Sequence, residues 1–332
     1  MLSAITSAHE SIYLEMYIFE GDTRDYDFLS ALEESAKRGV QVKIILDALG
    51  SSALPKAAVE RLRKAGAEVL FFSFLFRRTH RKMLVVDERI AFVGGVNIGK
   101  HFALWKDLQV RFSGKNVVGA VVRSFARMYR QCGGKDDLLQ NIGRPSVLQK
   151  TKLWFVEHGV GERRHTLRRH YEERIGRAKK RIVLVTPYLM PPRWLLAQLD
   201  QALIRGVAVD VLVPRKTDHA FVDRANWYYV SFISDLGAPC HLFPEMNHAK
   251  AMLIDGEEGM LGSQNLDTLS FDWNAEAGVF FHEAGMVRDL TRIIEGWLSE
   301  AQLFDPSKEK KLRWYDKVLG FFLRALGFSF LK

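Results

Sequence analysis

Residues 80–97 read HRKMLVVDERIAFVGGVN, and residues 248–265 read HAKAMLIDGEEGMLGSQN. In both stretches His, Lys, Asp, Gly and Asn stand at positions 0, +2, +7, +14 and +17 from the histidine. From average residue frequencies, this pattern is expected at a given position with odds of roughly a few in a hundred million. Its recurrence 168 residues later therefore indicates an internal duplication.

The duplication extends outward from these two stretches. An apolar strand pattern precedes each of them, at residues 12–19 and 181–188, and a helical segment that ends in Arg-Gly-Val follows. Glycine directly after a helix is a common stop signal. Further apolar strands follow at residues 42–46 and 207–213, and then a second helix that ends in Gly-Ala. This alternation predicts an α/β fold of two similar halves, each a mixed β-sheet flanked by helices, packed about a pseudo-twofold axis with the active site between them.

Turn-rich sequence separates the two halves. A helix predicted at residues 117–130 is followed by GGKDD at residues 133–137 and by GRPS at residues 143–146. We therefore assign residues 1–135 to the first half, 136–155 to a linker, 156–305 to the second half and 306–332 to a C-terminal amphipathic basic helix.

The composition narrows the class of protein and of partner. The 332 residues are 48% hydrophobic and 26% charged, as in ordinary globular proteins. A formal net charge of +9 favours an anionic partner, such as phosphate, nucleic acid or an acidic membrane surface. Two cysteines, Cys132 and Cys240, are too few for a disulfide framework and indicate reduced thiols in a cytoplasmic protein. No run of about 18 apolar residues predicts a membrane-spanning helix, and no signal-peptide pattern is visible.

The polar side chains shared by the two stretches suit a phosphodiester. They are His80, Lys82, Asn97, His248, Lys250 and Asn265. The histidine and lysine of each pair lie two residues apart, so both point to one face of a strand. Lysine and asparagine supply mainly donors for a tetrahedral anion, while two histidines can supply a nucleophile and a proton donor at neutral pH. No cluster has metal-ligand spacing, so neither a metal nor another cofactor is expected.

The doubled His-x-Lys-x4-Asp motif followed by Gly-[Gly/Ser]-x-Asn resembles the signature of the phospholipase D superfamily, over about residues 10–300. The resemblance implies metal-independent transfer through a phosphohistidine intermediate. It implies that His80 attacks phosphorus, whereas His248 protonates the leaving oxygen and then deprotonates the incoming alcohol or water. The pseudo-symmetry leaves open which histidine is the nucleophile. The non-bridging oxygens would be held by Lys82, Lys250, Asn97 and Asn265.

Each histidine also needs an acidic partner that fixes its tautomer. The superfamily places such an acid after the second motif, where this chain has Glu276, 28 residues after His248. In the first half Asp107 follows His80 by 27 residues, so the offset differs by one.

The motif aspartates, Asp87 and Asp255, are counted among the catalytic residues because they complete the shared pattern. Each lies at the far end of an apolar strand from its histidine. This position favours fixing the turn over carrying a proton.

Within the superfamily, the motifs resemble those of bacterial cardiolipin synthases. The similar segments are IAFVGGVN (90–97), TPY (186–188) and GSQNLDTLS (262–270). The resemblance implies phosphatidyl transfer from phosphatidylglycerol to a second phospholipid or an alcohol, at the cytoplasmic face of a bacterial cell membrane. The alternatives are a phospholipase D-type hydrolase, a nuclease or phosphodiesterase acting on nucleic acid, and a catalytically silent membrane-binding protein. Both complete motifs on one chain favour a lipid enzyme, so nucleic acid is not the expected partner, and the acceptor stays open.

The C-terminal residues 311–332 alternate large apolar side chains with five cations. This pattern predicts a helix that lies in an anionic lipid interface, which would make the protein peripheral on the membrane. The alternative is a helix that packs on the domain.

Overall fold

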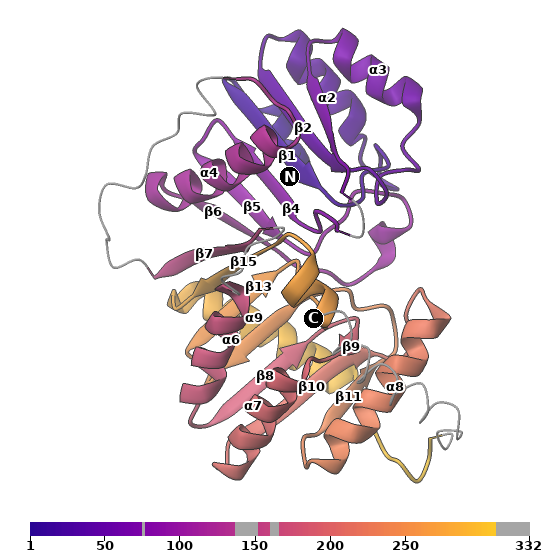
Figure 1. Cartoon of the computed structure of the whole chain (residues 1–332), viewed down its shortest axis with the longest axis vertical. Coiled ribbons are helices and arrows are strands. Elements are labelled where there is room, and N and C mark those ends of the chain that lie inside the picture. The colour runs from indigo at the N-terminus through magenta and orange to yellow at the C-terminus, as the bar shows by residue number, and fades with distance from the viewer. Residues whose placement is uncertain (75–76, 137–151, 160–165, 310–332) are drawn as a thin grey trace.

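The computed structural model describes residues 1–74, 77–136, 152–159 and 166–309. Its first half contains a sheet with the order β3-β2-β1-β4-β5-β6 (Figure 1). Strands β1, β2 and β3 are parallel, and β4, β5 and β6 continue the sheet in antiparallel fashion, so the sheet is mixed. The strands are β1 (Ser11–Met16), β2 (Gln41–Asp47), β3 (Glu68–Phe72), β4 (Lys82–Val86), β5 (Ile90–Gly94) and β6 (Gln109–Ser113).

The second half repeats this topology. Its sheet has the order β16-β11-β10-β8-β12-β13-β15-β7, in which β11-β10-β8-β12-β13-β15 corresponds to the whole first sheet. The strands are β7 (Leu153–His158), β8 (Arg181–Val185), β10 (Ala208–Pro214), β11 (Cys240–Phe243), β12 (Ala251–Ile254), β13 (Glu258–Gly262), β15 (Glu276–Phe281) and β16 (Gln302–Leu303). A separate two-stranded ladder joins β9 (Leu189–Met190) to β14 (Leu266–Asp267).

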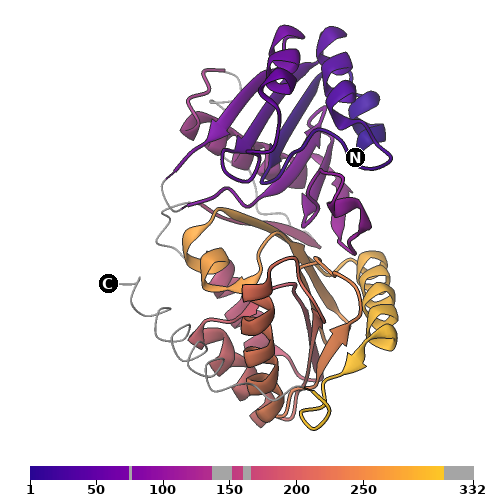
Figure 2. The same cartoon turned by 90° about the vertical axis from the view of Figure 1, so that its right-hand side faces the viewer.

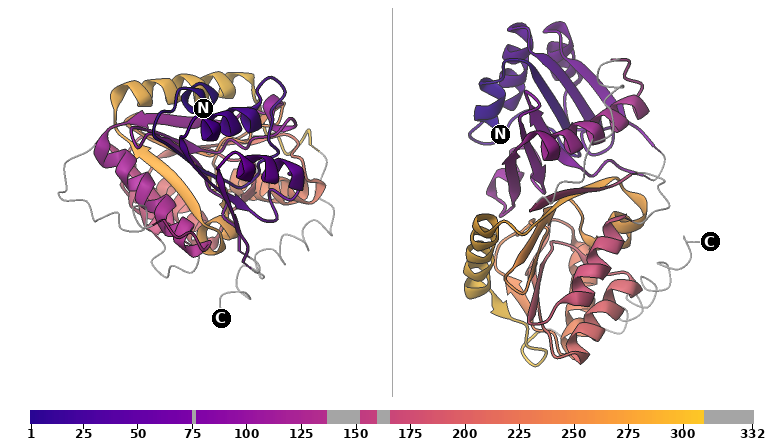
Figure 3. Two further views of the ribbon diagram at one scale, coloured as in Figure 1. Left: turned by 90° about the horizontal axis from the view of Figure 1, so that it is seen from above. Right: turned by 90° about the vertical axis from the view of Figure 1, so that its left-hand side faces the viewer.

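Helices cover both faces of each sheet, as Figures 2 and 3 show from the side. In the first half α1, α2 and α3 share a core with one face, and α4 packs on the other. In the second half α6, α7 and α8 lie on one face and α9 on the other. The helices are α1 (Leu2–Thr6), α2 (Phe28–Lys37), α3 (Lys56–Lys64), α4 (Lys115–Gln131), α6 (Thr166–Arg177), α7 (Arg193–Ile204), α8 (Ala220–Asp235) and α9 (Ala284–Glu300), with the short helices η1 (Phe102–Leu104) and η2 (Leu269–Trp273).

The predicted α/β class and the two similar halves are thus confirmed. The predicted helix ends also agree with the structure where a glycine follows the helix. The Arg-Gly-Val sequences end α2 and α7. Gly39 and Gly206 directly follow these helix ends and have φ of 90° and 82°. Glycine adopts this left-handed backbone at low cost, so the chain can leave the helix and turn back into β2 or β10.

Alternation along the central strands divides the apolar side chains among three cores. In β4, Leu84 and Val86 face the outer core of the first half, while Met83 and Val85 face the opposite way. This second face joins the equivalent face of the second sheet, together with α4 and α9, in one core that spans both halves. The two halves are therefore held together by a shared apolar layer, whose burial is the main force favouring their association.

Several sequence predictions fall partly or wholly outside the described residues. Residues 310–332 hold nearly all of the predicted C-terminal helix, and residues 137–151 hold most of the predicted linker. Strand β7 begins at Leu153, inside the range assigned to the linker, and pairs with β15. The division into segments otherwise stays a prediction. Among the described residues, no helix has the length and apolar character needed to span a bilayer.

Candidate active site

At each motif histidine, the backbone of one half forms hydrogen bonds with the backbone of the other half. The N–H of His80 donates to the carbonyl of Ala275 at 2.9 Å, and the N–H of Ala275 donates to the carbonyl of Arg78 at 2.8 Å. In the reciprocal position the N–H of His248 donates to the carbonyl of Lys106 at 2.7 Å. These two parallel bridges bring the acid that follows each bridging residue beside the histidine of the opposite half.

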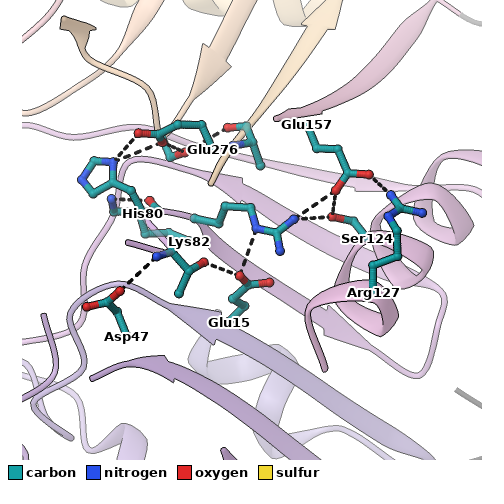
Figure 4. A network of polar contacts seen from close by, with 12 residues as sticks. Glu15, Asp47, His80, Lys82, Ser124, Arg127, Glu157 and Glu276 are labelled. Atoms are coloured by element: carbon teal, nitrogen blue, oxygen red, sulfur yellow. Dashed lines mark hydrogen bonds and ion pairs between the residues drawn. The ribbon is translucent and has the colours of Figure 1, made fainter. Parts of the chain in front are cut away.

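Two histidine–carboxylate pairs result, and both are crossed between the halves. His80 Nδ1 lies 3.0 and 3.1 Å from the two carboxylate oxygens of Glu276 (Figure 4), and His248 Nδ1 lies 2.7 Å from Asp107 Oδ2. All four side chains are largely buried. Because an ionised carboxylate only accepts hydrogen bonds, a neutral imidazole in either pair carries its proton on Nδ1 and keeps its lone pair on Nε2.

The residue after the motif glycine supports each acid, by different means in the two halves. In the second half the Ser263 hydroxyl hydrogen-bonds Glu276 Oε2. In the first half the corresponding residue is Gly95, where an added Cβ would lie 2.3 Å from Asp107 Oδ1. Glycine is therefore required at residue 95, because any side chain would displace the shorter acid from its histidine.

The two motif lysines are buried beside the histidines. Lys82 Nζ donates to the carbonyl of His80 at 2.7 Å, and Lys250 Nζ donates to the carbonyl of His248. Within the described part of the chain, neither ammonium forms an ion pair with a carboxylate. The ring centroid of Tyr17 lies 5.1 Å from Lys82 Nζ, which offers partial compensation for the charge. Two buried lysines without a directly bonded carboxylate form a site suited to an anion.

Burial and like charge lower the pKa of these groups. Burial chiefly, and then the neighbouring Lys250, hold the pKa of Lys82 well below its usual value. The pKa of Lys250 falls to about 8, mainly through burial. Burial also lowers the pKa of His80 and lowers that of His248 to about 4, with the motif lysines adding to the effect. Each histidine is affected by the lysines of both halves, which is the electrostatic signature of one shared site.

The two motif asparagines, Asn97 and Asn265, are also buried. In each, Oδ1 has no hydrogen-bond partner among the described residues. A buried acceptor without a partner is uncommon in a folded protein and is expected where a donor from a ligand or a water completes the site.

Asp87 and Asp255, which the shared pattern counts among the catalytic residues, accept hydrogen bonds from backbone N–H groups in the structure, in line with the turn-fixing role that their position in the sequence favours. Asp87 accepts hydrogen bonds from the backbone N–H groups of residues 9, 10 and 11, and Asp255 accepts them from residues 179, 180 and 181. Both aspartates have positive φ, in the tight turns that follow β4 and β12. They lie at the strand ends remote from the histidines, so their contacts tie each turn to the start of the first parallel strand.

Sequence analysis missed a second group of polar residues that holds the first motif. Thr79 donates from its N–H to Asp47 Oδ2 at 3.0 Å and from its hydroxyl to Glu15 Oε1. Arg81 bonds Glu15 and also Glu157, which lies on β7 of the second half; Figure 4 labels both carboxylates. The available signal was a carboxylate within or at the end of an otherwise apolar strand, at residues 15 and 47.

Three aromatic rings also surround the histidines and were not predicted. The Tyr17 ring lies 4.7 Å from the His80 ring, while the Trp105 and Tyr188 rings lie 5.2 and 6.3 Å from the His248 ring, all measured between centroids. Among the described residues, no group of three or more His, Cys, Asp or Glu side chains is placed to hold a metal ion.

Comparison with known families matches the chain to one domain type. A family model described as cardiolipin synthase, PLD-like domain, matches residues 1–129 and 171–297. The chain is 32% identical over 313 residues to the major cardiolipin synthase ClsA of Bacillus subtilis, covering 87% of this chain and 64% of that protein. It is 32% identical over 335 residues to a cardiolipin synthase of Listeria welshimeri, covering 95% of this chain and 69% of that protein. The chain thus spans about two thirds of the length of these relatives.

Solved structures show the same fold at low sequence identity. The phosphatidylserine synthase of Haemophilus influenzae superposes with a TM-score of 0.73 at 15% identity, covering 100% of this chain and 91% of that one. The polyphosphate kinase of Porphyromonas gingivalis superposes with a TM-score of 0.64 at 18% identity, covering 99% of this chain and 50% of that one. These similarities concern the arrangement of the two halves.

Proposed function

The chain belongs to the family of cardiolipin synthases with phospholipase D-like domains, and from that membership we propose that it transfers phosphatidyl groups between phospholipids through a covalent phosphohistidine. The observation that carries this proposal is the pair of crossed histidine–carboxylate contacts around two buried lysines that bond no carboxylate among the described residues. Such a site offers a nucleophile, a proton carrier and a cationic pocket for one phosphodiester group.

The first step forms a phosphorus–nitrogen bond and breaks a phosphorus–oxygen bond. His80 Nε2 attacks the phosphorus of phosphatidylglycerol, and the glycerol oxygen leaves with the bonding electron pair. His248 gives its proton to that oxygen, so free glycerol departs. Glu276 stabilises the positive charge that develops on the His80 ring, since the carboxylate is 3.0 Å from Nδ1.

Proton supply follows from the charges in the site. Burial and the motif lysines lower the pKa of His248 to about 4 in the unliganded protein, so this imidazole is neutral near pH 7. A bound phosphodiester brings a negative charge that offsets the lysines. Substrate binding therefore raises the pKa of the imidazole and favours uptake of the proton that the leaving oxygen needs.

The second step reverses the first with a different alcohol. The neutral His248 removes the proton from the hydroxyl of a second phosphatidylglycerol or another alcohol, and this oxygen attacks phosphorus while the bond to His80 breaks. Lys82, Lys250 and the two motif asparagines hold the non-bridging oxygens through both steps. The enzyme would act as a peripheral protein at a phospholipid membrane, where both lipids reside.

Product analysis tests the proposal. Purified protein is incubated with phosphatidylglycerol, with and without phosphatidylethanolamine, and the lipids are identified by mass, with the His80→Ala variant as control. We expect diphosphatidylglycerol and glycerol from the native protein and neither from the variant. Phosphatidic acid as the sole product would identify a hydrolase. Cleavage of DNA without any change in the lipids would identify a nuclease and contradict the proposal.

A further inference from the structure

We infer that the protein rests directly on the bilayer with the face that carries its active site, through apolar side chains that both halves present near the catalytic histidines. This inference rests on the proposed function in one respect: the substrate is a lipid that stays in the membrane. The observation behind it is the position of the exposed large hydrophobic side chains. Six of the eleven found among the described residues, here called the rim residues, are Tyr26, Leu49, Phe74, Leu104, Phe221 and Leu269.

All six rim residues lie in connections at the end of each sheet where the catalytic histidines are found. In the first sheet β1, β2 and β3 end, β4 begins and β5 ends at one end, because β4 is antiparallel to both β1 and β5. The connections at that end of the sheet span residues 17–27, 48–55, 73–74 with 77–81, and 95–108, and among their described residues each holds one rim residue. The other five exposed hydrophobic residues lie within strands β3, β7 and β16 or on helices α7 and α9.

In the second sheet the same end carries the remaining two rim residues. Leu269 begins η2, in the connection between β13 and β15, and Phe221 is the second residue of α8, which follows the end of β10. Large apolar side chains in water have a free-energy cost that burial removes. Their concentration on these connections in both halves indicates a surface that is covered during function.

Contacts within the site connect this rim to the catalytic histidines. Leu104 precedes Trp105, whose ring lies 5.2 Å from that of His248. His219 lies two residues before Phe221. The centroid of the Tyr188 ring lies 6.4 Å from that of the His219 ring and 6.3 Å from that of the His248 ring. Lipid that contacts the rim would therefore have its headgroup within a few side chains of the reacting atoms.

The first half makes the same connection through backbone contacts. Arg78 Nη1 donates to the carbonyl of Phe74 at 3.2 Å, and Arg78 itself bridges to the other half beside His80. Asp47 accepts from the N–H of Leu49 at 3.1 Å and from Thr79, the residue before that histidine. In both halves, the exposed apolar side chains thus lie on segments that contact the motif or its neighbouring residues.

The charged residues on the same connections favour a contact with the bilayer that is mainly apolar. The exposed cations of these connections are Arg24, Lys100, Lys106 and Lys216, and the exposed carboxylates are Asp25, Asp27 and Asp218. Because the two sets nearly balance, attraction to anionic headgroups is small and insertion of apolar side chains supplies most of the affinity. A second copy of the chain is the other occupant that an exposed apolar surface could take.

Site-specific labelling tests the placement directly. Leu104 and Ile204 are matched, with 67% and 70% of their surface exposed, but Ile204 ends α7, away from the rim. Burial raises the pKa of both native thiols, Cys132 and Cys240, to about 12, so an introduced surface cysteine is labelled preferentially by a polarity-sensitive dye. We expect the dye in Leu104→Cys to brighten and shift to the blue with vesicles of phosphatidylglycerol and phosphatidylcholine, and the dye in Ile204→Cys to stay unchanged.

Loss-of-function variants complete the test. We expect Leu104→Ser combined with Phe221→Ser to weaken sedimentation with the same vesicles by about tenfold or more, from two lost apolar insertions. Turnover of the soluble diester bis(4-nitrophenyl) phosphate should stay within about twofold, since neither residue contacts the reacting groups. Ile204→Ser combined with Leu303→Ser, a matched exposed pair, should change neither measurement.

The outcomes separate this inference from the proposed chemistry. Equal dye responses at residues 104 and 204, or equal sedimentation of both double variants, would overturn the membrane contact. A change of oligomeric state in the rim variant without vesicles, with sedimentation unaltered, would also overturn it and indicate contact between two copies. Rim-dependent binding by a protein that turns over no phosphodiester would leave the contact standing and reject the proposed function.

Discussion

His80 and His248 each meet a carboxylate at Nδ1, and this contact determines which nitrogen reacts. The carboxylate holds the Nδ1 proton, so Nε2 is the atom available to phosphorus or to the leaving oxygen. The two rings therefore have the same local chemistry. In the proposed reaction, their separate tasks would follow from where the scissile bond lies between them.

Removal of one histidine should stop turnover at a defined stage. With His248→Ala and a diester that has a very good leaving group, the first step needs little protonation, so phosphate should stay bound to His80. Intact-mass analysis after reaction would show the adduct, and steady turnover of the phospholipid should fall by about three orders of magnitude or more. In His80→Ala we expect no adduct. An adduct on that variant, and none on His248→Ala, would reverse the assigned roles.

The lowered pKa of Lys250 predicts an alkaline limit to substrate binding. Burial is the main cause that brings its pKa to about 8, so the side chain is cationic below that pH and becomes neutral above it. Binding of an anionic diester should therefore weaken as pH rises through about 8, by roughly tenfold per unit at most. The measurement is kcat/KM for a soluble diester from pH 6 to 10. Lys250→Arg, which keeps its charge, should move the limit to higher pH, whereas a flat native profile would contradict the prediction.

At the scale of single elements, the turn after β4 shows how a motif residue can be structural. Asp87 accepts three backbone N–H groups at the start of β1. Its burial raises the carboxyl pKa, but these bonds outweigh that effect and lower the pKa below 3.8. The resulting stabilisation is present above the unfolded pKa and is lost as pH falls through the folded pKa.

Asp87→Ala should consequently destabilise the protein and leave the chemistry largely intact. Loss of the carboxylate removes three charge-assisted hydrogen bonds at a cost of about 1–3 kcal/mol, which lowers Tm by several degrees. We expect kcat on a soluble diester to change less than about threefold at 25 °C. Asp289→Ala, which removes an exposed ion pair with Arg292, serves as control and should change the free energy of unfolding by less than about 1 kcal/mol. Loss of kcat with unchanged Tm would restore a catalytic role for Asp87.

At the scale of the whole molecule, a buried charged network joins the halves beside the site. Arg81 is 2% exposed and bonds Glu15 at 2.9 Å, Ser124 at 2.7 Å and Glu157 at 3.0 Å. Glu157 belongs to β7, so the network crosses from the first half to the second. The second motif has Ala249 at the corresponding position, so this connection exists on one side of the pseudo-symmetric site only.

Arg81→Ala should lower the free energy of unfolding by about 3–5 kcal/mol, because it leaves the Glu15 carboxylate buried without its cation. Urea unfolding followed by circular dichroism measures the change. Arg127→Met is the matched control: Arg127 also pairs with Glu157 but is half exposed, so its loss should cost less than about 1 kcal/mol. Equal effects of the two variants would show that burial of the network contributes nothing beyond a surface ion pair.

The sequence alone determined the features that depend on short spacings. The doubled motif, the alternation of strands with helices and the positions of His80, Lys82 and their counterparts follow from residues within about twenty positions of one another. Strand periodicity places side chains two residues apart on one face, and a glycine directly after a helix allows the chain to turn. For this reason the fold class and the six polar motif residues can be predicted from local patterns in the chain.

Only the tertiary structure decided which acid serves which histidine. His80 pairs with Glu276 and His248 pairs with Asp107, across separations of 196 and 141 residues. The contacts of Arg81 with Glu157 likewise depend on how the two sheets meet. Spacing along the chain specifies neighbours on a strand or helix, whereas contacts between distant segments are set by the shared apolar core that docks the halves. No local pattern encodes that docking, so the crossed pairs emerge only when the halves are packed together.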